Sequence, residues 1–218
     1  MSFGQITLEL LGGFGYTLAI FAITLAAAIP FGLVVALGSM SKFKPVSTLC
    51  RAFVWVIRGT PLMLQIIVFA YGPGLWLQIP IRTLPQKLLM VCIAFSINYA
   101  CYFSEIFRGG IQSISQGQYE AGQVLGMTKR QIFFRVVLLQ VTKRIIPPMS
   151  NEIITLVKDT ALASVVVAVD LFTVAKEIVN LEVILWPLFY AGLFYLLFNG
   201  LLTVLLGKLE KKLDYFKV

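Results

Sequence analysis

The sequence predicts an all-α polytopic membrane protein with five transmembrane helices. Apolar residues make up 59% of the 218 positions and charged residues only 13%, whereas a soluble domain carries roughly a quarter of charged residues. The mean hydropathy is +0.89. Several apolar stretches exceed the roughly 20 residues that a helix needs to cross a bilayer. Because these stretches are continuously apolar rather than alternating, they favour spanning helices over the strands of a barrel.

The positions of the apolar stretches predict five spans within a single transmembrane domain that covers residues 1–218. The first is expected at about residues 14–40, with a kink at Pro30. The second, at about 46–71, is interrupted by the sequence RGTP at 58–61. The remaining spans are expected at about 86–107, 147–169 and 183–206, with short polar connections at 71–85 and 170–182.

The basic residues predict the orientation of these spans. Fourteen Lys and Arg residues fall within 42–58, 108–144 and 208–217, whereas only three fall in the connections on the opposite side. Because cytoplasmic loops are enriched in Lys and Arg, the N-terminus is expected outside and the C-terminus in the cytoplasm. The net charge of +8 then reflects topology and contact with anionic lipid head groups. Nucleic-acid binding is not expected, because it would need a basic face with interleaved aromatic residues on a soluble domain.

Several kinds of chemistry are excluded by the residue types that the chain lacks. There is no histidine, which removes His-based acid–base catalysis and His-ligated metal sites. Cys50, Cys92 and Cys101 stand singly in apolar surroundings and are expected to be small buried side chains. No G-x-x-x-x-G-K-[ST] phosphate loop is present. The chain is therefore expected to bind no metal and no cofactor, and not to be an enzyme.

One polar segment, SQGQYEAGQVLGMTKRQ at residues 115–131, contrasts with its apolar surroundings. Residues 117–125 suit a short helix, and Gly126 suits a left-handed C-terminal cap. Thr128, followed three residues later by Gln131, predicts an N-cap with a capping box.

The same segment offers a face that another protein could approach closely, because small Ala121 and Gly122 lie beside Glu120. On physical grounds alone, the hairpin at about 108–146 is either a solvated cytoplasmic loop or a docking surface.

The sequence EAGQVLG at 120–126 resembles the EAA signature of bacterial ABC-importer permeases. That signature reads Glu-Ala-Ala, three residues, Gly, nine residues and then Ile-x-Leu-Pro. The residues that match are Glu120, Ala121 and Gly126, with Val136 and Leu138 in the apolar places. Gly122 replaces the second Ala, and Leu139 replaces the Pro.

Three further segments and the five-span layout resemble the polar amino-acid permease subfamily, the histidine, glutamine and arginine permease-like proteins. The segments are RGTPLMLQ (58–65), SEIFRGGIQSISQGQYEA (104–121) and PPMSNEIITLVKDTALASV (147–165). The resemblance implies a type I ABC-importer permease fold in the bacterial cytoplasmic membrane. It also implies a coupling helix that docks onto a separate cytoplasmic ATPase, formed by Glu120, Ala121, Gly122, Leu125 and Gly126.

The partners expected from this resemblance supply what the chain lacks. ATP and Mg would be bound by the partner ATPase, and an extracytoplasmic binding protein would deliver a polar amino acid, basic ones included. Because five spans make half a pore, a second permease subunit is needed, either the same chain or a paralogue. The alternative is an amino-acid secondary transporter or channel that is not driven by ATP, although such proteins typically show internal repeats that are not evident in this sequence. A membrane enzyme would need a clustered catalytic set, which the scattered acids do not provide.

Small or polar residues recur at helical spacing within the third and fourth spans. They are Ala94, Asn98, Cys101, Tyr102 and Glu105 in the third, and Glu152, Thr155, Asp159 and Ala163 in the fourth. A charge near mid-membrane costs about 2.5–3.5 kcal/mol on insertion scales, so these faces are not expected to contact lipid. Hydrogen bonds between helices return only about 0.6 kcal/mol, which favours a substrate or gating pathway over a purely structural role.

An amino acid needs acceptors for its ammonium group and donors for its carboxylate. Glu105 and Asp159 are candidates for the first role, and Asn98 for the second; the two acids would also suit a cationic side chain. Lys158 is not expected to pair with Asp159, because adjacent residues point apart on a helix. The remaining substrate-binding candidates are Tyr102, Ser164 and, near the RGTP break, Thr60 and Gln65. Arg58 is either a simple interfacial anchor at a helix break or, as the resemblance implies, part of a structural break that lines the inner gate.

Overall fold

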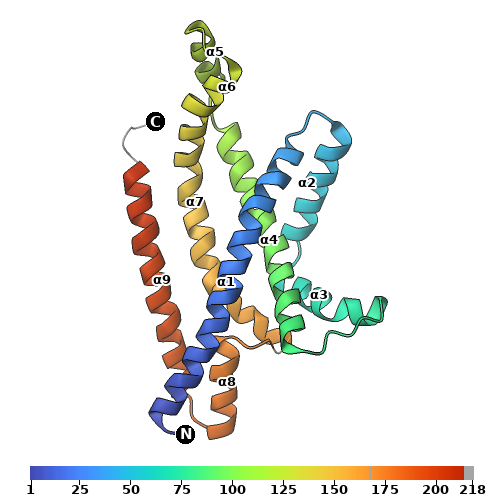
Figure 1. Ribbon diagram of the computed structural model, residues 1–218, viewed down its shortest axis with the longest axis vertical. Coiled ribbons are helices and arrows are strands. Elements are labelled where there is room, and N and C mark those ends of the chain that lie inside the picture. Colours follow the sequence, from blue (N-terminus) through green and yellow to red (C-terminus); the bar gives the residue numbers. More distant parts are fainter. Residues whose placement is uncertain (167, 214–218) are drawn as a thin grey trace.

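The computed structural model describes residues 1–166 and 168–213, and every regular element in these ranges is a helix (Figure 1). In chain order, the elements are α1 (Phe3–Ser39), α2 (Lys44–Arg58), α3 (Leu62–Trp76), α4 (Leu84–Gln112), α5 (Gln116–Val124), α6 (Lys129–Ile132), the π-helical turn η1 (Phe133–Val137), α7 (Leu138–Asp159), the 3-10 turn η2 (Thr160–Val166), α8 (Leu171–Glu182) and α9 (Trp186–Leu213). Figure 1 shows α5 and α6 at one end of the long axis, with α8 and the N-terminus at the other.

Helix α1 begins eleven residues before the predicted first span, 14–40. Its start is set by a capping box, in which Gln5 N donates to Ser2 Oγ (3.3 Å) and Ser2 N donates to Gln5 Oε1 (2.8 Å). The helix continues through Pro30 without a break. Small residues four apart form the buried stripe of its second half, which packs on α4: Thr24, Ala28, Gly32 and Ala36. Small side chains allow this close approach of two membrane helices.

The predicted interruption of the second span, 46–71, is confirmed. Helices α2 and α3 are bent by 102° relative to each other. Pro61 has no N–H to continue the helix, and it disfavours helical geometry in the residue before it. The hydroxyl of Thr60 donates to Val56 O (3.0 Å) and so satisfies a carbonyl at the end of α2.

Three helices of the described residues are long and apolar enough to cross a membrane, namely α1, α4 and α9, and the bent pair α2–α3 would make a fourth. The predicted fourth span corresponds to α7 and η2. Helix α7 does not meet these criteria, because it carries five charged residues: Lys143, Arg144, Glu152, Lys158 and Asp159. The fold is therefore compatible with five membrane spans, and that number stays a prediction. Residue 167 of that span and the basic Lys217 lie outside the described residues.

The polar connection expected at 170–182 is in fact helix α8. Asp170 caps it, since its carboxylate accepts hydrogen bonds from Thr173 N (3.0 Å) and Phe172 N (3.1 Å). One face is apolar and buried in a small core with residues of α1 and α9: Ile6, Leu10, Leu171, Ala175, Ile178 and Ala191. Packing of this face, rather than crossing of the membrane, accounts for the helix.

Candidate functional site

The polar segment after α4 folds into the predicted capped hairpin. Gly126 has a φ of +72°, and Met127 N donates to Gly122 O (3.0 Å), which confirms the left-handed C-cap of α5. The capping box of α6 is also confirmed, because Gln131 N donates to Thr128 Oγ1 (3.3 Å) and Thr128 N donates to Gln131 Oε1 (2.8 Å). Local sequence therefore determines both ends of the turn.

The glycine at position 122 is explained by the way the hairpin packs. A Cβ added there would lie 2.6 Å from Cγ1 of Ile132, whose side chain is only 1% exposed. The hairpin closes on this contact, so the larger Ile132 takes the space that an alanine would need. At the other departure from the EAA signature, Leu139 lies inside α7, which continues directly from the π-helical turn.

The remaining candidate coupling residues, namely Glu120, Ala121, Leu125 and Gly126, are exposed on the projecting hairpin (Figure 1). Val124 and Leu125 are 88% and 78% exposed, an uncommon position for aliphatic side chains on a polar helix. The hairpin is held in place from α7, since Gln140 Nε2 donates to Gln118 Oε1 (2.9 Å) and Arg144 donates to Ser113 O. It therefore presents a fixed, partly apolar surface.

A polar cavity of about 450 Å³ lies at the α2–α3 break and is closed by α4 and α7. We call it the polar cavity; its lining residues are Arg58, Gly59, Thr60, Pro61, Leu62, Asn98, Tyr99, Tyr102, Glu152, Thr155 and Asp159. Four of the predicted substrate-binding residues meet here, namely Thr60, Asn98, Tyr102 and Asp159. They come from three separate parts of the sequence, which only the fold brings together.

Gln65 lies behind this lining and fixes the break to α4. Its Nε2 donates to Ile57 O (2.8 Å) and to Thr60 Oγ1 (2.8 Å), and its Oε1 accepts from Asn98 Nδ2 (3.0 Å). Gln65 is 8% exposed and Asn98 is 4% exposed. Gln65 therefore positions Thr60 and Asn98 rather than lining the cavity itself.

Two acids of α7 face the polar cavity. Asp159 Oδ2 accepts a hydrogen bond from the hydroxyl of Tyr99 (2.7 Å), and Glu152 lies two helical turns earlier on the same face. None of the ion pairs between described residues involves either acid. Glu152 was not among the predicted site residues, although its seven-residue spacing from Asp159 was visible in the sequence. Together the two acids offer acceptors for a cationic group.

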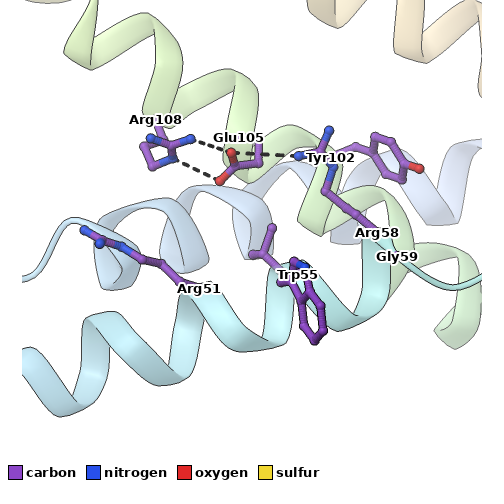
Figure 2. A pocket seen from close by; sticks show the side chains of 8 residues that line it. Arg51, Trp55, Arg58, Gly59, Tyr102, Glu105 and Arg108 are labelled. Carbon is purple, nitrogen blue, oxygen red and sulfur yellow. Dashed lines mark hydrogen bonds and ion pairs between the residues drawn. The ribbon is translucent and has the colours of Figure 1, made fainter.

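Glu105 does not line the polar cavity. It faces a second cavity of about 580 Å³, shown in Figure 2 and called here the arginine cavity, whose lining is Arg51, Val54, Trp55, Arg58, Gly59, Tyr102, Glu105 and Arg108. Arg108 Nε donates to Glu105 Oε1 (3.0 Å), and Arg58 Nη1 lies 3.8 Å from Glu105 Oε2. The Glu105 carboxylate is thus engaged by two guanidinium groups, unlike the free acceptor that the spacing alone predicted.

Ser164 is also separate from both cavities. It lies in η2 and its hydroxyl donates to Ala161 O (2.7 Å). Over residues 1–166 and 168–213, no group of three or more His, Cys, Asp or Glu side chains is arranged to hold a metal ion. The two cavities offer polar and charged side chains to a small solute.

Comparison with known proteins decides the family. The model of the family described as "binding-protein-dependent transport system inner membrane component" matches residues 28–215. The chain belongs to this family. Because the match takes in the last third of α1 and all later helices, it covers the polar cavity, the arginine cavity and the hairpin together.

Two curated relatives of this inner membrane component are bacterial permeases. The L-cystine transport system permease protein TcyB of Bacillus subtilis (strain 168) is 37% identical over 208 residues, which cover 94% of this chain and 86% of TcyB. The arginine transport system permease protein ArtQ of the same organism is 33% identical over 205 residues, covering 94% and 92% of the two chains. These relatives confirm the resemblance to amino-acid ABC-importer permeases.

Solved structures confirm the fold of the inner membrane component. A crystal structure of an amino acid ABC transporter with histidines superposes with a TM-score of 0.86 at 29% identity, over 95% of each chain. An inward-facing structure of the MetNI methionine ABC transporter gives a TM-score of 0.74 at 16% identity and supports the fold alone. The chain is thus a multi-pass permease subunit of the bacterial inner membrane.

Proposed function

We propose that this permease carries a polar amino acid into the cytoplasm as the membrane-spanning subunit of an ATP-driven importer. The observation that carries the proposal is the polar cavity, where carboxylate, phenol, hydroxyl and amide groups from the α2–α3 break, α4 and α7 surround about 450 Å³. The names of the relatives, which specify L-cystine and arginine, support an amino acid as the solute.

Asp159 and Glu152 are the proposed acceptors for the ammonium group, because neither has a cationic partner among the described residues. Arg58 and the second N–H of Asn98 Nδ2 are the proposed donors for the carboxylate, since both residues line the same cavity; Thr60 lines it too, with its hydroxyl proton donated to Val56 O. With two acids available, a basic side chain would find a second acceptor.

The exposed face of α5 is the proposed docking surface for a separate cytoplasmic ATPase, which would bind ATP and Mg. Exposed Leu125 and Val124 give this surface the apolar centre that protein interfaces need. We further propose that a second permease subunit completes the pore and that an extracytoplasmic binding protein delivers the solute. In this arrangement, the hairpin and the C-terminus are cytoplasmic and the N-terminus is outside.

Co-purification tests the docking surface. A tagged chain is solubilised gently from native membranes, and every co-purifying polypeptide is identified; we expect a stoichiometric ATPase. Leu125→Asp should remove the ATPase, whereas Leu181→Asp on α8 should not, because Leu181 is equally exposed (77% against 78%) but lies at the opposite end of the molecule (Figure 1). A chain that purifies alone, together with uptake unaffected by Glu120→Lys, would favour a channel or secondary transporter.

A second variant tests the cavity. Asp159→Asn removes the proposed acceptor charge but keeps the size of the side chain and its ability to accept from Tyr99. We expect lower ATP-dependent uptake with normal recovery of the ATPase. Uptake equal to that of the unmodified chain would assign Asp159 a structural role only.

A further inference from the structure

The polar cavity and the arginine cavity meet at three residues. Both are lined by Arg58, Gly59 and Tyr102. Arg51 and Arg108 line only the arginine cavity, and Arg108 lies one turn before the end of α4, which leads into the α5–α6 hairpin. The arginine cavity therefore lies on the hairpin side of the polar cavity, on the route that a solute released toward the hairpin side would take.

Arg58 lies where the two cavities adjoin, since it lines both of them. Its guanidinium carbon lies 4.9 Å from the centre of the Tyr102 ring, and its Nη1 lies 3.8 Å from Glu105 Oε2 (Figure 2). Both contacts are weak individually: the ion pair is at the limit of contact distance and the Arg58 side chain is 41% exposed. In contrast, Arg108 holds Glu105 with two of its nitrogens. Arg58 is therefore the member of the cluster that can move.

The charge of the arginine cavity is unbalanced. Three arginines line it against the single carboxylate of Glu105, which Arg108 already engages. A cavity lined by one sign of charge raises the local concentration of the opposite sign and repels its own. Inorganic cations would therefore be repelled at this point, whereas a carboxylate would be attracted.

We propose that Arg58 is a carboxylate-responsive gate. At rest, its guanidinium lies over Tyr102 and separates the two cavities, and its charge excludes inorganic cations. An amino acid in the polar cavity presents a carboxylate that pairs with the guanidinium and draws it from Tyr102 and Glu105, which opens the route. The gate therefore selects solutes that carry a carboxylate, whatever their side chain. This inference depends on the proposed route through the polar cavity.

Thiol labelling tests the gate without substrate or ATP. The reporter is Thr155→Cys, because Thr155 lines only the polar cavity. It is placed in a background of Cys50→Ser, Cys92→Ala and Cys101→Ala, in inside-out vesicles from cells that also express the native partners. Two impermeant reagents are compared, anionic 2-sulfonatoethyl and cationic 2-(trimethylammonium)ethyl methanethiosulfonate, each normalised to its rate with free 2-mercaptoethanol.

We expect the anionic reagent to label the reporter about tenfold faster than the cationic one. Each reagent must pass close to the Arg58 guanidinium, where the interaction between two unit charges is only partly screened. Arg58→Gln should raise the cationic rate by about tenfold and abolish the preference. The matched control is Arg51→Gln, which removes the same charge from the same cavity; Arg51 is seven residues from Arg58, about 10 Å along the helix. Because Arg51 lines the arginine cavity but not the polar cavity, its removal should raise the cationic rate by less than Arg58→Gln does and should leave the preference for the anionic reagent in place.

Two results would overturn the gate. The first is that Arg58→Gln changes the labelling rate of the reporter by less than about twofold with both reagents. The second is a reporter that no variant makes reactive, although its thiol reacts after denaturation in SDS. If Arg58→Gln does not accumulate in the membrane, Tyr102→Leu tests the same gate and should raise the cationic rate about threefold, the worth of one cation–π contact. Since uptake is not measured, the gate can fail while ATP-driven import is confirmed.

Discussion

The hydroxyl of Tyr99 on α4 donates a 2.7 Å hydrogen bond to Asp159 on α7, between residues 60 positions apart in the chain. The Tyr99 ring is 2% exposed and stacks on Phe95, with ring centroids 6.3 Å apart. Since Asp159 has no ion-pair partner among the described residues, this phenol is its principal support. The contact joins two helices and leaves the other carboxylate oxygen of Asp159 available to the polar cavity.

Removing this hydroxyl should therefore weaken the α4–α7 contact. Tyr99→Phe keeps the stacked ring but leaves Asp159 without its donor. We expect the free energy of unfolding to fall by about 1–2 kcal/mol, which lies between the values typical of hydrogen bonds between membrane helices and of hydrogen bonds to charged groups. Thermal unfolding of the purified assembly measures it. Tyr71→Phe is the control, because Tyr71 is 46% exposed. Equal melting temperatures for the two variants would contradict a structural role for the phenol.

The contact between Gly122 and Ile132 predicts a pair of compensating substitutions. Gly122→Ala restores the EAA pattern but forces a methyl group against Ile132, and overpacking of this kind costs about 1–3 kcal/mol. We expect reduced ATPase recovery in the single variant. Ile132→Ala, which removes the Cγ1 and Cδ1 atoms that the added methyl group meets, should restore recovery when combined with Gly122→Ala. A Gly122→Ala chain that binds the ATPase normally would show that the hairpin yields at this point.

The left-handed turn after α5 predicts a ranking of substitutions at Gly126. No atom lies within 4 Å of a Cβ added at Gly126, so only its backbone angle, φ +72°, opposes a side chain. Gly126→Ala should destabilise the hairpin by about 1–2 kcal/mol, and Gly126→Asn by less, because asparagine tolerates this region. Amide hydrogen exchange of residues 116–132 measures the difference. Similar exchange in the two variants would contradict the ranking.

The capping of α8 predicts the effect of removing a buried carboxylate. Asp170 is fully buried and also accepts hydrogen bonds from the Thr173 hydroxyl and from Tyr195 on α9 (3.4 Å). Asp170→Ala should cost at least the roughly 0.5–2 kcal/mol of a lost N-cap, because the backbone N–H of the buried Thr173 then loses its acceptor. Asp170→Asn, which still accepts at one oxygen, should cost less. Thermal unfolding compares the two variants, and an Asn variant less stable than the Ala variant would refute this role.

Structural features that depend on residues close together in the chain could be predicted from the sequence. The capping box at Thr128 and the cap at Gly126 depend on residues within one turn, and Pro61 breaks the second span by lacking an N–H. Helix α8 was missed because its twelve residues are too few and too polar to look like a span. Its start, Asp170 followed by apolar Leu171 and Phe172 and then Thr173, was nevertheless a readable N-cap.

The sequence by itself determined the membrane class of this protein, the family it belongs to and the local shape of its hairpin, because hydrophobicity, motif spacing and helix caps are properties of short stretches. Only the tertiary structure decided which charges share a cavity. Glu105 and Asp159 look equivalent as acids within spans, yet one is held by arginines of α2 and α4 and the other by a phenol beside Glu152. The partners of a charged group come from helices distant in the sequence, so the packing of those helices, rather than the spacing within any one of them, assigns each acid its role.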